Sequence, residues 1–219
     1  IMPLCMLAAN YPGIASQLEG LVAYPEGHTF PLYEFFVLMK DISGNAQYTE
    51  DEHALCEALK NGPLMYTNAA KAIGKDMYGL KTARLEADGV ILRSGLTPTD
   101  IMHIQGDFTG FDKAASLAGA EFVAHYAHTS LEELCRKVYD MVEEKLYCNL
   151  VRILMDTEFQ ALKNTLSDSQ IETLIHISYE QAKSGKEAFF STRFSTKAIL
   201  VGVGAPTHIF LSSVACLLG

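Results

Sequence analysis

Residues 49–93 carry a pattern of apolar and polar positions that predicts three helices followed by a strand. Thr49 and Glu52 have the spacing of a capping box, and an apolar stripe follows them. The predicted elements are, in chain order, a helix that stops at 61–63, a helix over 66–73, a helix that begins near 76 and a strand over 90–93. We expect these residues to form a helical insert within a larger domain.

A second helical block is predicted after Asp112, which is a suitable N-cap for the helix that follows it. A longer amphipathic helix is predicted from Thr129, because its apolar residues fall three and four positions apart. This helix either continues to Leu162 or breaks near Asn149. Another helix is predicted to begin at Ser167.

Two apolar runs predict strands. LYEFFVLM, over 32–39, is rich in strand-forming residues. Residues 198–203 form a β-branched, apolar run without a polar side, which predicts a strand buried on both faces. Near the N-terminus, a short helix is expected to stop at Tyr11-Pro12-Gly13. Strands mixed with many helices indicate a helix-rich α/β class.

Composition limits the function classes. A chain of 219 residues can bury one sizeable core or two small ones, and its formal charge of -9 disfavours a nucleic-acid or anionic membrane surface. The apolar opening over 1–9 lacks a basic region and is too short to span a bilayer. The five scattered cysteines predict free thiols in a reducing, cytoplasmic compartment. Because the chain starts at Ile1 without a methionine, we expect a piece of a longer protein.

The segment 94–112, SGLTPTDIMHIQGDFTGFD, concentrates oxygen and nitrogen donors among glycine and proline. Asp100 and His103 are expected one turn apart on a helix started by Thr99, with Asp107 on the following loop. Such a group could hold a metal or work as acid and base, and we assign it catalysis without a metal. The structural alternative is a set of caps and turns around a core histidine, and the spacing leaves both open.

A glycine turn follows the second apolar run. Gly202 and Gly204 allow another group to approach the backbone, Pro206 suits a helix start, and Thr207 is a candidate N-cap. A helix that begins there points free N–H groups at the mouth of the turn, which can receive a phosphate or a ribose. The same pattern occurs in strand–helix connections that bind nothing.

Three pieces of the chain resemble the hydantoinase A / 5-oxoprolinase family. LTPTDIMHIQGDFTGFDKAA, over 96–115, resembles the family's LTPTD segment with its following histidine and G-x-(F/Y). VGVGAPTHIFLSSVA, over 201–215, is similar to the family's later GxGAP-type segment. PLCMLAANYPG, over 3–13, is similar to the stretch that lies just after the family's catalytic half. The pieces occur in the family's order.

The resemblance implies both a fold and an activity. The family is related to the fold of actin, Hsp70 and the acetate and sugar kinases, which binds ATP between two lobes. It implies that 1–48 and 94–219 form the second lobe of this fold, with 49–93 as the insert. The implied reaction is ATP-dependent hydrolysis of a small cyclic amide, with Mg²⁺ carried on the nucleotide. The residues implied for nucleotide binding are Gly202, Gly204, Ala205, Pro206 and Thr207.

The sequence also departs from the family. The phosphate loop of the first lobe, of the Asp-x-Gly-Gly-Thr type, is absent, and so is the later Gly-Gly-Thr-Ser-Thr-Asp segment. We therefore expect this chain to be inactive alone and to need an N-terminal lobe or a partner subunit. A homo-oligomer is a further expectation, and a membrane partner is not expected.

The alternative function is a non-catalytic binding or scaffold domain. The three helices and strand predicted over 49–93 resemble a winged helix-turn-helix, a fold that contacts DNA. The third helix region offers basic residues, but acidic residues balance them: Lys75, Lys81 and Arg84 stand against Asp76, Glu86 and Asp88. Because phosphate binding needs an excess of positive charge, nucleic acid is the less favoured partner.

Overall fold

A computed structural model describes residues 1–23, 33–159, 165–185, 189–204 and 206–219 of the protein. The chain forms two compact units, Ile1–Cys135 and Arg136–Gly219. The first unit contains a small sheet between helices, and the second contains helices and an extended segment. The helix-rich α/β class predicted from the sequence is therefore confirmed.

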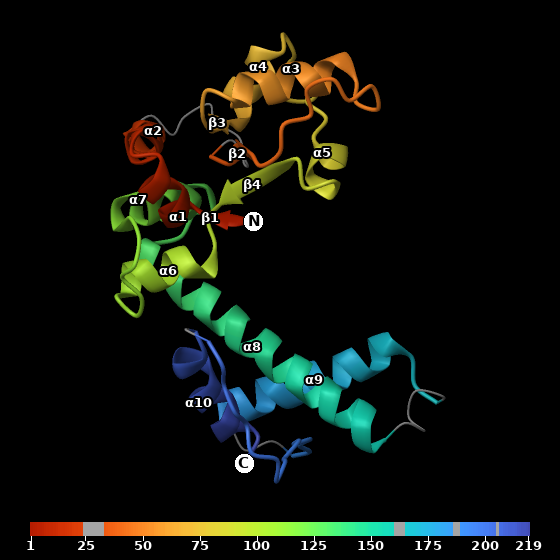
Figure 1. Ribbon diagram of the computed structural model, residues 1–219. Helices are drawn as coiled ribbons and strands as arrows, with labels where there is room; N and C mark the ends of the chain where they lie inside the picture. Colours follow the sequence, from red (N-terminus) through yellow and green to blue (C-terminus); the bar gives the residue numbers. More distant parts are fainter. Residues whose placement is uncertain (24–32, 160–164, 186–188, 205) are drawn as a thin grey trace. The chain divides into compact units, whose positions relative to one another are not determined.

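The sheet of the first unit is mixed and has the strand order β1-β4-β2-β3 (Figure 1). Its strands are β1 (Met2–Pro3), β2 (Phe35–Leu38), β3 (Leu64–Met65) and β4 (Ile91–Gly95). Strand β1 runs parallel to β4, while β2 runs antiparallel to both β4 and β3. The strands predicted over 32–39 and 90–93 are thus confirmed.

One face of the sheet is covered by the helices that precede β2 and follow β4. These helices are α1 (Leu4–Asn10), α2 (Gly13–Ala23) and α7 (Lys113–Tyr126), and the short α6 (Pro98–Gln105) packs on α7. Phe35 and Val37 point to this face and join a core with Leu18 and Phe122. Helix α1 ends before Pro12, as predicted.

The opposite face is covered by α3 (Glu50–Leu59), α4 (Tyr66–Ala72) and α5 (Ala83–Ala87). Phe36, next to Phe35 in β2, points to this side and packs in a core with Leu55 and Ile91. The capping box of Thr49 and Glu52 is confirmed at the start of α3. The alternating side chains of β2 thus divide the first unit into two cores.

The third helix predicted from Asp76 is much shorter than expected. The Asp76 carboxylate accepts backbone N–H groups of Tyr78 and Gly79, at 3.0 and 2.7 Å, and so holds a turn where a helix was predicted. Strand β4 pairs with β1 and β2, and β3 pairs with β2, so β3 and β4 do not pair with each other. Residues 49–93 belong to the same compact unit and sheet as 1–48.

The second unit is built on three helices, α8 (Leu131–Glu158), α9 (Asp168–Ser184) and α10 (Thr207–Leu217). Helix α8 passes Asn149 without a break, so the predicted break is wrong. The helix ends at Glu158, and Leu162 lies outside the described residues. The capping box of Ser167 is confirmed at the start of α9. A buried cluster that includes Tyr147, Ile175 and Val214 joins the three helices.

The prediction of a strand over 198–203 is wrong. These residues form neither helix nor strand, and Ile199, Val201 and Val203 are 90%, 79% and 90% exposed. A β-branched, apolar sequence becomes a strand only beside another strand, because its backbone groups need partners. Within the described part of the second unit, no strand is present to provide them.

No helix among the described residues is long and apolar enough to cross a membrane.

Candidate functional site

The LTPTD segment forms the corner between β4 and α6. Thr97, and not Thr99 as expected, precedes the helix, because Pro98 occupies its first position and lacks an N–H group. The Thr97 N–H and hydroxyl both donate to Oδ2 of Asp100 at 2.8 Å. Asp100 therefore closes the corner that its own segment forms.

The Asp100 carboxylate also binds two segments far away in the sequence. Its Oδ1 accepts the Cys5 N–H at 2.8 Å and the Ser116 hydroxyl at 3.0 Å, and its Oδ2 accepts the Leu4 N–H at 3.3 Å. Asp100 is fully buried, and with Thr97 its two oxygens accept five hydrogen bonds. A carboxylate so fully engaged positions α1, α6 and α7. We call Asp100 with Leu4, Cys5, Thr97 and Ser116 the Asp100 cluster.

Cys5 contributes its backbone to the Asp100 cluster, while its thiol stays protonated. Burial and, next, the neighbouring Asp100 charge raise the pKa of Cys5 to about 12. A thiol is a nucleophile only as the thiolate, so Cys5 offers no nucleophile at neutral pH. Sequence analysis missed Cys5 and Ser116 because their partner lies 95 and 16 residues away along the chain.

His103 lies one turn beyond Asp100 on α6 and is 1% exposed. Its ring centroid is 5.0 Å from that of Phe108 and 5.9 Å from that of Phe111. Burial lowers the pKa of His103, although the charges of Asp100 and Asp112 oppose this shift. Its Nε2 is buried and has no hydrogen-bond partner among the described residues. The lowered pKa favours the neutral imidazole, and its unpaired Nε2 is enclosed by the protein.

Asp107 is exposed, whereas the other two predicted catalytic residues are buried. Helix α6 ends at Gln105 and is capped by Gly106, whose φ of 87° is left-handed, and Asp107 follows. The Asp107 N–H donates to the carbonyl of Met102 at 3.0 Å, and the residue is exposed. The structure therefore places Asp100 and His103 together inside the unit and Asp107 at its surface.

The predicted nucleotide-binding residues lie in the second unit, at the start of α10. Pro206 precedes the helix, and Thr207 is its first residue instead of its N-cap. The Thr207 hydroxyl donates to the carbonyl of Gly204 at 2.7 Å and so fixes the turn. Gly204 has a φ of +112°, which favours glycine. Ala205 lies outside the described residues.

Gly202 is required for packing. A Cβ at this position would stand 2.6 Å from the Cβ of Thr207 and 2.9 Å from Leu211 Cδ2. The close approach that the sequence predicted at Gly202 is therefore made by α10 itself. The helix N-terminus and Gly204 remain the part of this turn that is open to a ligand.

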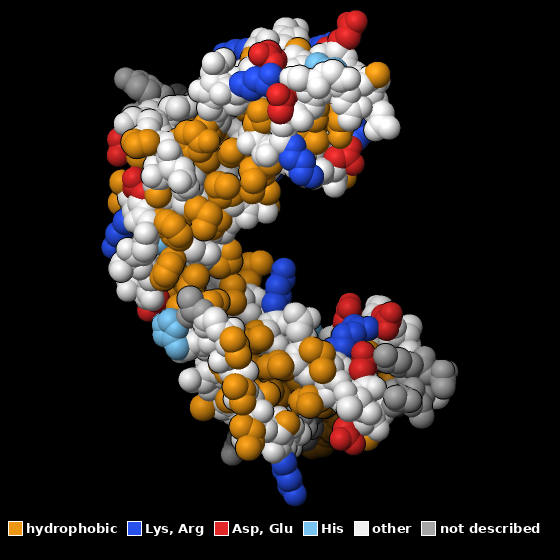
Figure 2. Space-filling model, viewed as in Figure 1, with side chains coloured by type: hydrophobic (Ala, Val, Ile, Leu, Met, Phe, Trp, Pro, Cys, Tyr) orange, Lys and Arg blue, Asp and Glu red, His pale blue; other side chains and the backbone are white. Residues whose placement is uncertain are grey.

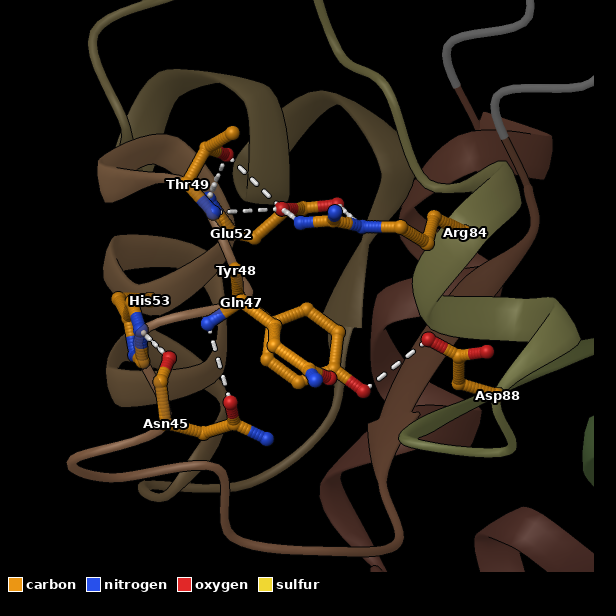
Figure 3. A network of polar contacts seen from close by, with 8 residues as sticks. All are labelled: Asn45, Gln47, Tyr48, Thr49, Glu52, His53, Arg84 and Asp88. Atoms are coloured by element: carbon orange, nitrogen blue, oxygen red, sulfur yellow. Dashed lines mark hydrogen bonds and ion pairs between the residues drawn. The ribbon is translucent and has the colours of Figure 1, made fainter.

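Arg84, one of the three basic residues considered for the DNA-binding alternative, is engaged in a network between α3 and α5 (Figure 3). Arg84 binds both carboxylate oxygens of Glu52, with Nε to Oε1 at 2.9 Å, and its guanidinium lies 4.9 Å from the centre of the Tyr48 ring. The Tyr48 hydroxyl donates to Asp88 at 3.0 Å. This network holds α3 and α5 together. Because Glu52 neutralises the charge of Arg84, Arg84 is poorly suited to bind a phosphate.

A second buried carboxylate, Glu143, joins the three helices of the second unit. Its oxygens accept hydrogen bonds from Lys183, Ser213 and, at 3.2 Å, the Tyr179 hydroxyl. Burial raises the pKa of Glu143, but the hydrogen bonds from Lys183 and Ser213 outweigh it and lower the pKa. Sequence analysis missed Glu143, although its position one turn before Tyr147 places both residues on the same, buried side of α8.

Among the residues that the structure describes, no group of three or more His, Cys, Asp or Glu side chains could hold a metal ion. Comparisons with models of protein families, with curated proteins and with solved structures find no match. A functional assignment for this chain therefore rests on its residues and their geometry.

Proposed function

We propose that this chain is one lobe of a hydantoinase/oxoprolinase-like enzyme that opens a cyclic amide in an ATP-dependent reaction. The observation that carries the proposal is the convergence of family-like segments on Asp100. Cys5 belongs to the piece over 3–13 and Thr97 to the piece over 96–115, and both donate hydrogen bonds to the Asp100 carboxylate. Two separate resemblances thus meet in one buried cluster, which supports treating them as one pattern.

The proposed nucleotide site is the glycine turn with the N-terminus of α10. The first turn of a helix leaves N–H groups unpaired, and a phosphate is stabilised by such groups. Gly204 is exposed, and no atom lies within 4 Å of the place that a side chain would take. These features fit a nucleotide phosphate or ribose, and Mg²⁺ would arrive bound to the phosphates. The nucleotide would supply the free energy for opening the ring.

His103 is the residue proposed to transfer a proton. Its lowered pKa leaves the imidazole neutral at neutral pH, and its Nε2 is unpaired among the described residues. Asp100 is assigned the positioning of α6, and Asp107 is the exposed third member of the group. Because His103 is 1% exposed, a substrate reaches it only if the segment over 106–112 moves away.

We place the chain as the second lobe of an actin, Hsp70 and sugar-kinase-like fold, whose phosphate loop comes from an N-terminal lobe or a partner subunit. All five cysteines are free, which supports a reducing, cytoplasmic setting.

Nucleotide binding is tested by titrating the protein with Mg-ADP and comparing two exposed positions of α10. His208→Glu puts a negative charge in the first turn of the helix, where it would repel a phosphate, and should weaken binding about tenfold or more. Ser212→Glu, also exposed but further along the helix, should leave the affinity unchanged. Equal affinities for both variants would remove α10 from the site.

Activity is tested with a protein extended upstream of Ile1, using 5-oxoproline and hydantoin with Mg-ATP. We expect phosphate release to depend on the cyclic amide. His103→Gln should lower its rate at least 100-fold. If neither the chain nor the extended protein binds nucleotide, the enzyme proposal fails and a non-catalytic scaffold role replaces it. Nucleic-acid binding at low salt that is lost on charge reversal of Lys81 and Arg84 would instead support the winged-helix alternative.

A further inference from the structure

The segment over 191–203 of the second unit forms neither helix nor strand, but its side chains are arranged as on an extended backbone. Its side chains alternate over 191–197, with 192, 194 and 196 partly buried and the residues between them exposed. A period of two is that of an extended backbone, in which successive side chains point to opposite sides. Phe194 and, further along, Leu200 pack against the buried cluster of the three helices. The segment therefore has an inner and an outer side.

Gly202 continues the inner side toward α10. A Cβ there would overlap Thr207 and approach Leu211, so the absence of a side chain lets the backbone lie against the helix. Consequently Ile199, Val201 and Val203 all fall on the outer side. Each is at least 79% exposed. On the face of the second unit shown in Figure 2, hydrophobic side chains gather over α10 and its surroundings.

The backbone of the same residues is also unpaired. The last described backbone contacts before the turn are the Thr196 N–H to the Leu218 carbonyl at 3.1 Å and the Ala198 N–H to the Thr196 hydroxyl at 3.0 Å. From 199 to 203, no N–H or carbonyl has a hydrogen-bond partner among the described residues. An extended, apolar segment with unpaired backbone groups is a template for a further strand.

The sequence of this segment is complementary to itself. If two copies run antiparallel with Val201 opposite Val201, then Ile199 of each lies opposite Val203 of the other, and β-branched side chains meet in the pairs of the outer side. Residues 198–204 carry no charge, so the strands pair without opposing like charges, although the whole chain has a formal charge of -9. A two-fold interface needs such self-complementarity.

We propose that residues 198–203 of two copies of this chain pair as antiparallel strands about a two-fold axis at Val201 and so form a homodimer. The added strand covers the outer apolar side chains only in part, but it gives hydrogen-bond partners to the backbone groups of alternate residues in both copies. This explains why a sequence with strong strand character remains extended and exposed in a single chain. The proposal is independent of the proposed enzyme function.

The oligomeric state tests the interface. Sedimentation equilibrium should give twice the 24.0 kDa mass of the chain, and Val201→Lys should give the single mass because two charges would meet at the axis. Ile153→Lys is the matched control, since Ile153 is 61% exposed on α8, and this variant should remain dimeric. A protein that stays monomeric at about 1 mM, or a Val201→Lys variant that stays dimeric, overturns the proposal.

The register is tested by disulfide formation in a Cys216→Ser background, which removes the exposed thiol. Residues opposite each other in an antiparallel pair have Cα atoms about 4.5–5.5 Å apart, within reach of a disulfide. Val201→Cys should therefore cross-link to itself. Val203→Cys should cross-link to Ile199→Cys in a mixture and much less to itself. Cross-linking of Val201→Cys no faster than that of Ile153→Cys contradicts the two-fold register.

Discussion

Gly119 of α7 packs directly against the side chain of Leu4 in α1. A Cβ added at Gly119 would overlap Leu4 Cδ1, and Leu4 is fully buried and has little room to move. The absence of a side chain at Gly119 therefore sets how closely the two helices approach. Leu4 also donates its N–H to Asp100, so this contact lies beside the Asp100 cluster.

Gly119→Ala should destabilise the protein, even though alanine favours a helix. Overpacking a well-packed core costs about 1–3 kcal/mol, which exceeds the roughly 1 kcal/mol that alanine contributes to helix propensity. Gly20→Ala is the matched control, because nothing lies within 4 Å of the added Cβ in α2. Urea unfolding should show a lower free energy of unfolding for Gly119→Ala and a higher one for Gly20→Ala. An equal increase in the free energy of unfolding for both variants would mean that α1 and α7 are not closely packed.

Asp100→Asn should cost about 3–5 kcal/mol of the free energy of unfolding. The amide replaces one acceptor oxygen by an NH₂ group that faces donors, and the buried N–H and hydroxyl groups lose their charged partner. Asp112→Asn is the control, because asparagine caps a helix about as well as aspartate does. A loss below about 1 kcal/mol for Asp100→Asn, measured in urea, would contradict the assigned positioning role.

The thiols should differ in reactivity according to their burial. Burial raises the pKa of Cys5 to about 12 and that of Cys56 to about 11, so almost no thiolate is present on either at pH 8. Brief alkylation of the folded protein, followed by mass spectrometry, should label the exposed Cys216 first. Cys5 and Cys56 should react only after unfolding. Labelling of Cys5 as fast as Cys216 would show that the Asp100 cluster opens readily.

His103 should make stability fall at mildly acidic pH. Because burial lowers the pKa of His103, the unfolded chain takes up this proton near pH 6.5 while the folded protein does not. The free energy of unfolding should therefore decrease as the pH falls below about 6.5, and level off below the folded pKa.

A pair of histidine variants isolates this effect. His103→Leu removes the titrating group and should flatten the stability profile between pH 7.5 and 5, measured by urea unfolding. His208→Gln changes an exposed histidine and should keep the profile of the unsubstituted protein. If His103→Leu leaves the slope unchanged, another group is responsible for the pH dependence.

Much of the helical structure could be predicted because its signals are local. The capping boxes at Thr49 and Ser167 begin helices as expected, and Gly185 ends α9 in the left-handed conformation. Propensity was misleading near Asp76, where a side-chain hydrogen bond to the backbone replaced a helical turn.

The candidate site could be predicted only in part. The sequence placed Asp100 and His103 on one helix, and both lie on α6. It left open whether this segment was catalytic or structural, and for Asp100 the geometry favours a structural, positioning role, because donors from Cys5 and Ser116 occupy its Oδ1. No local pattern identifies donors that come from distant segments.

The sequence by itself determined where most helices begin and end, since caps and apolar spacing act within a few residues. The tertiary structure alone decided which strands pair and which carboxylates are buried. The run over 198–203 has strand-forming residues, yet no strand formed without a neighbour to accept its backbone hydrogen bonds. Asp100 was predicted to be catalytic, yet hydrogen bonds from Cys5 of α1 and Ser116 of α7 make it a buried contact between helices. Both outcomes depend on contacts between segments far apart in the chain, which a local pattern does not encode.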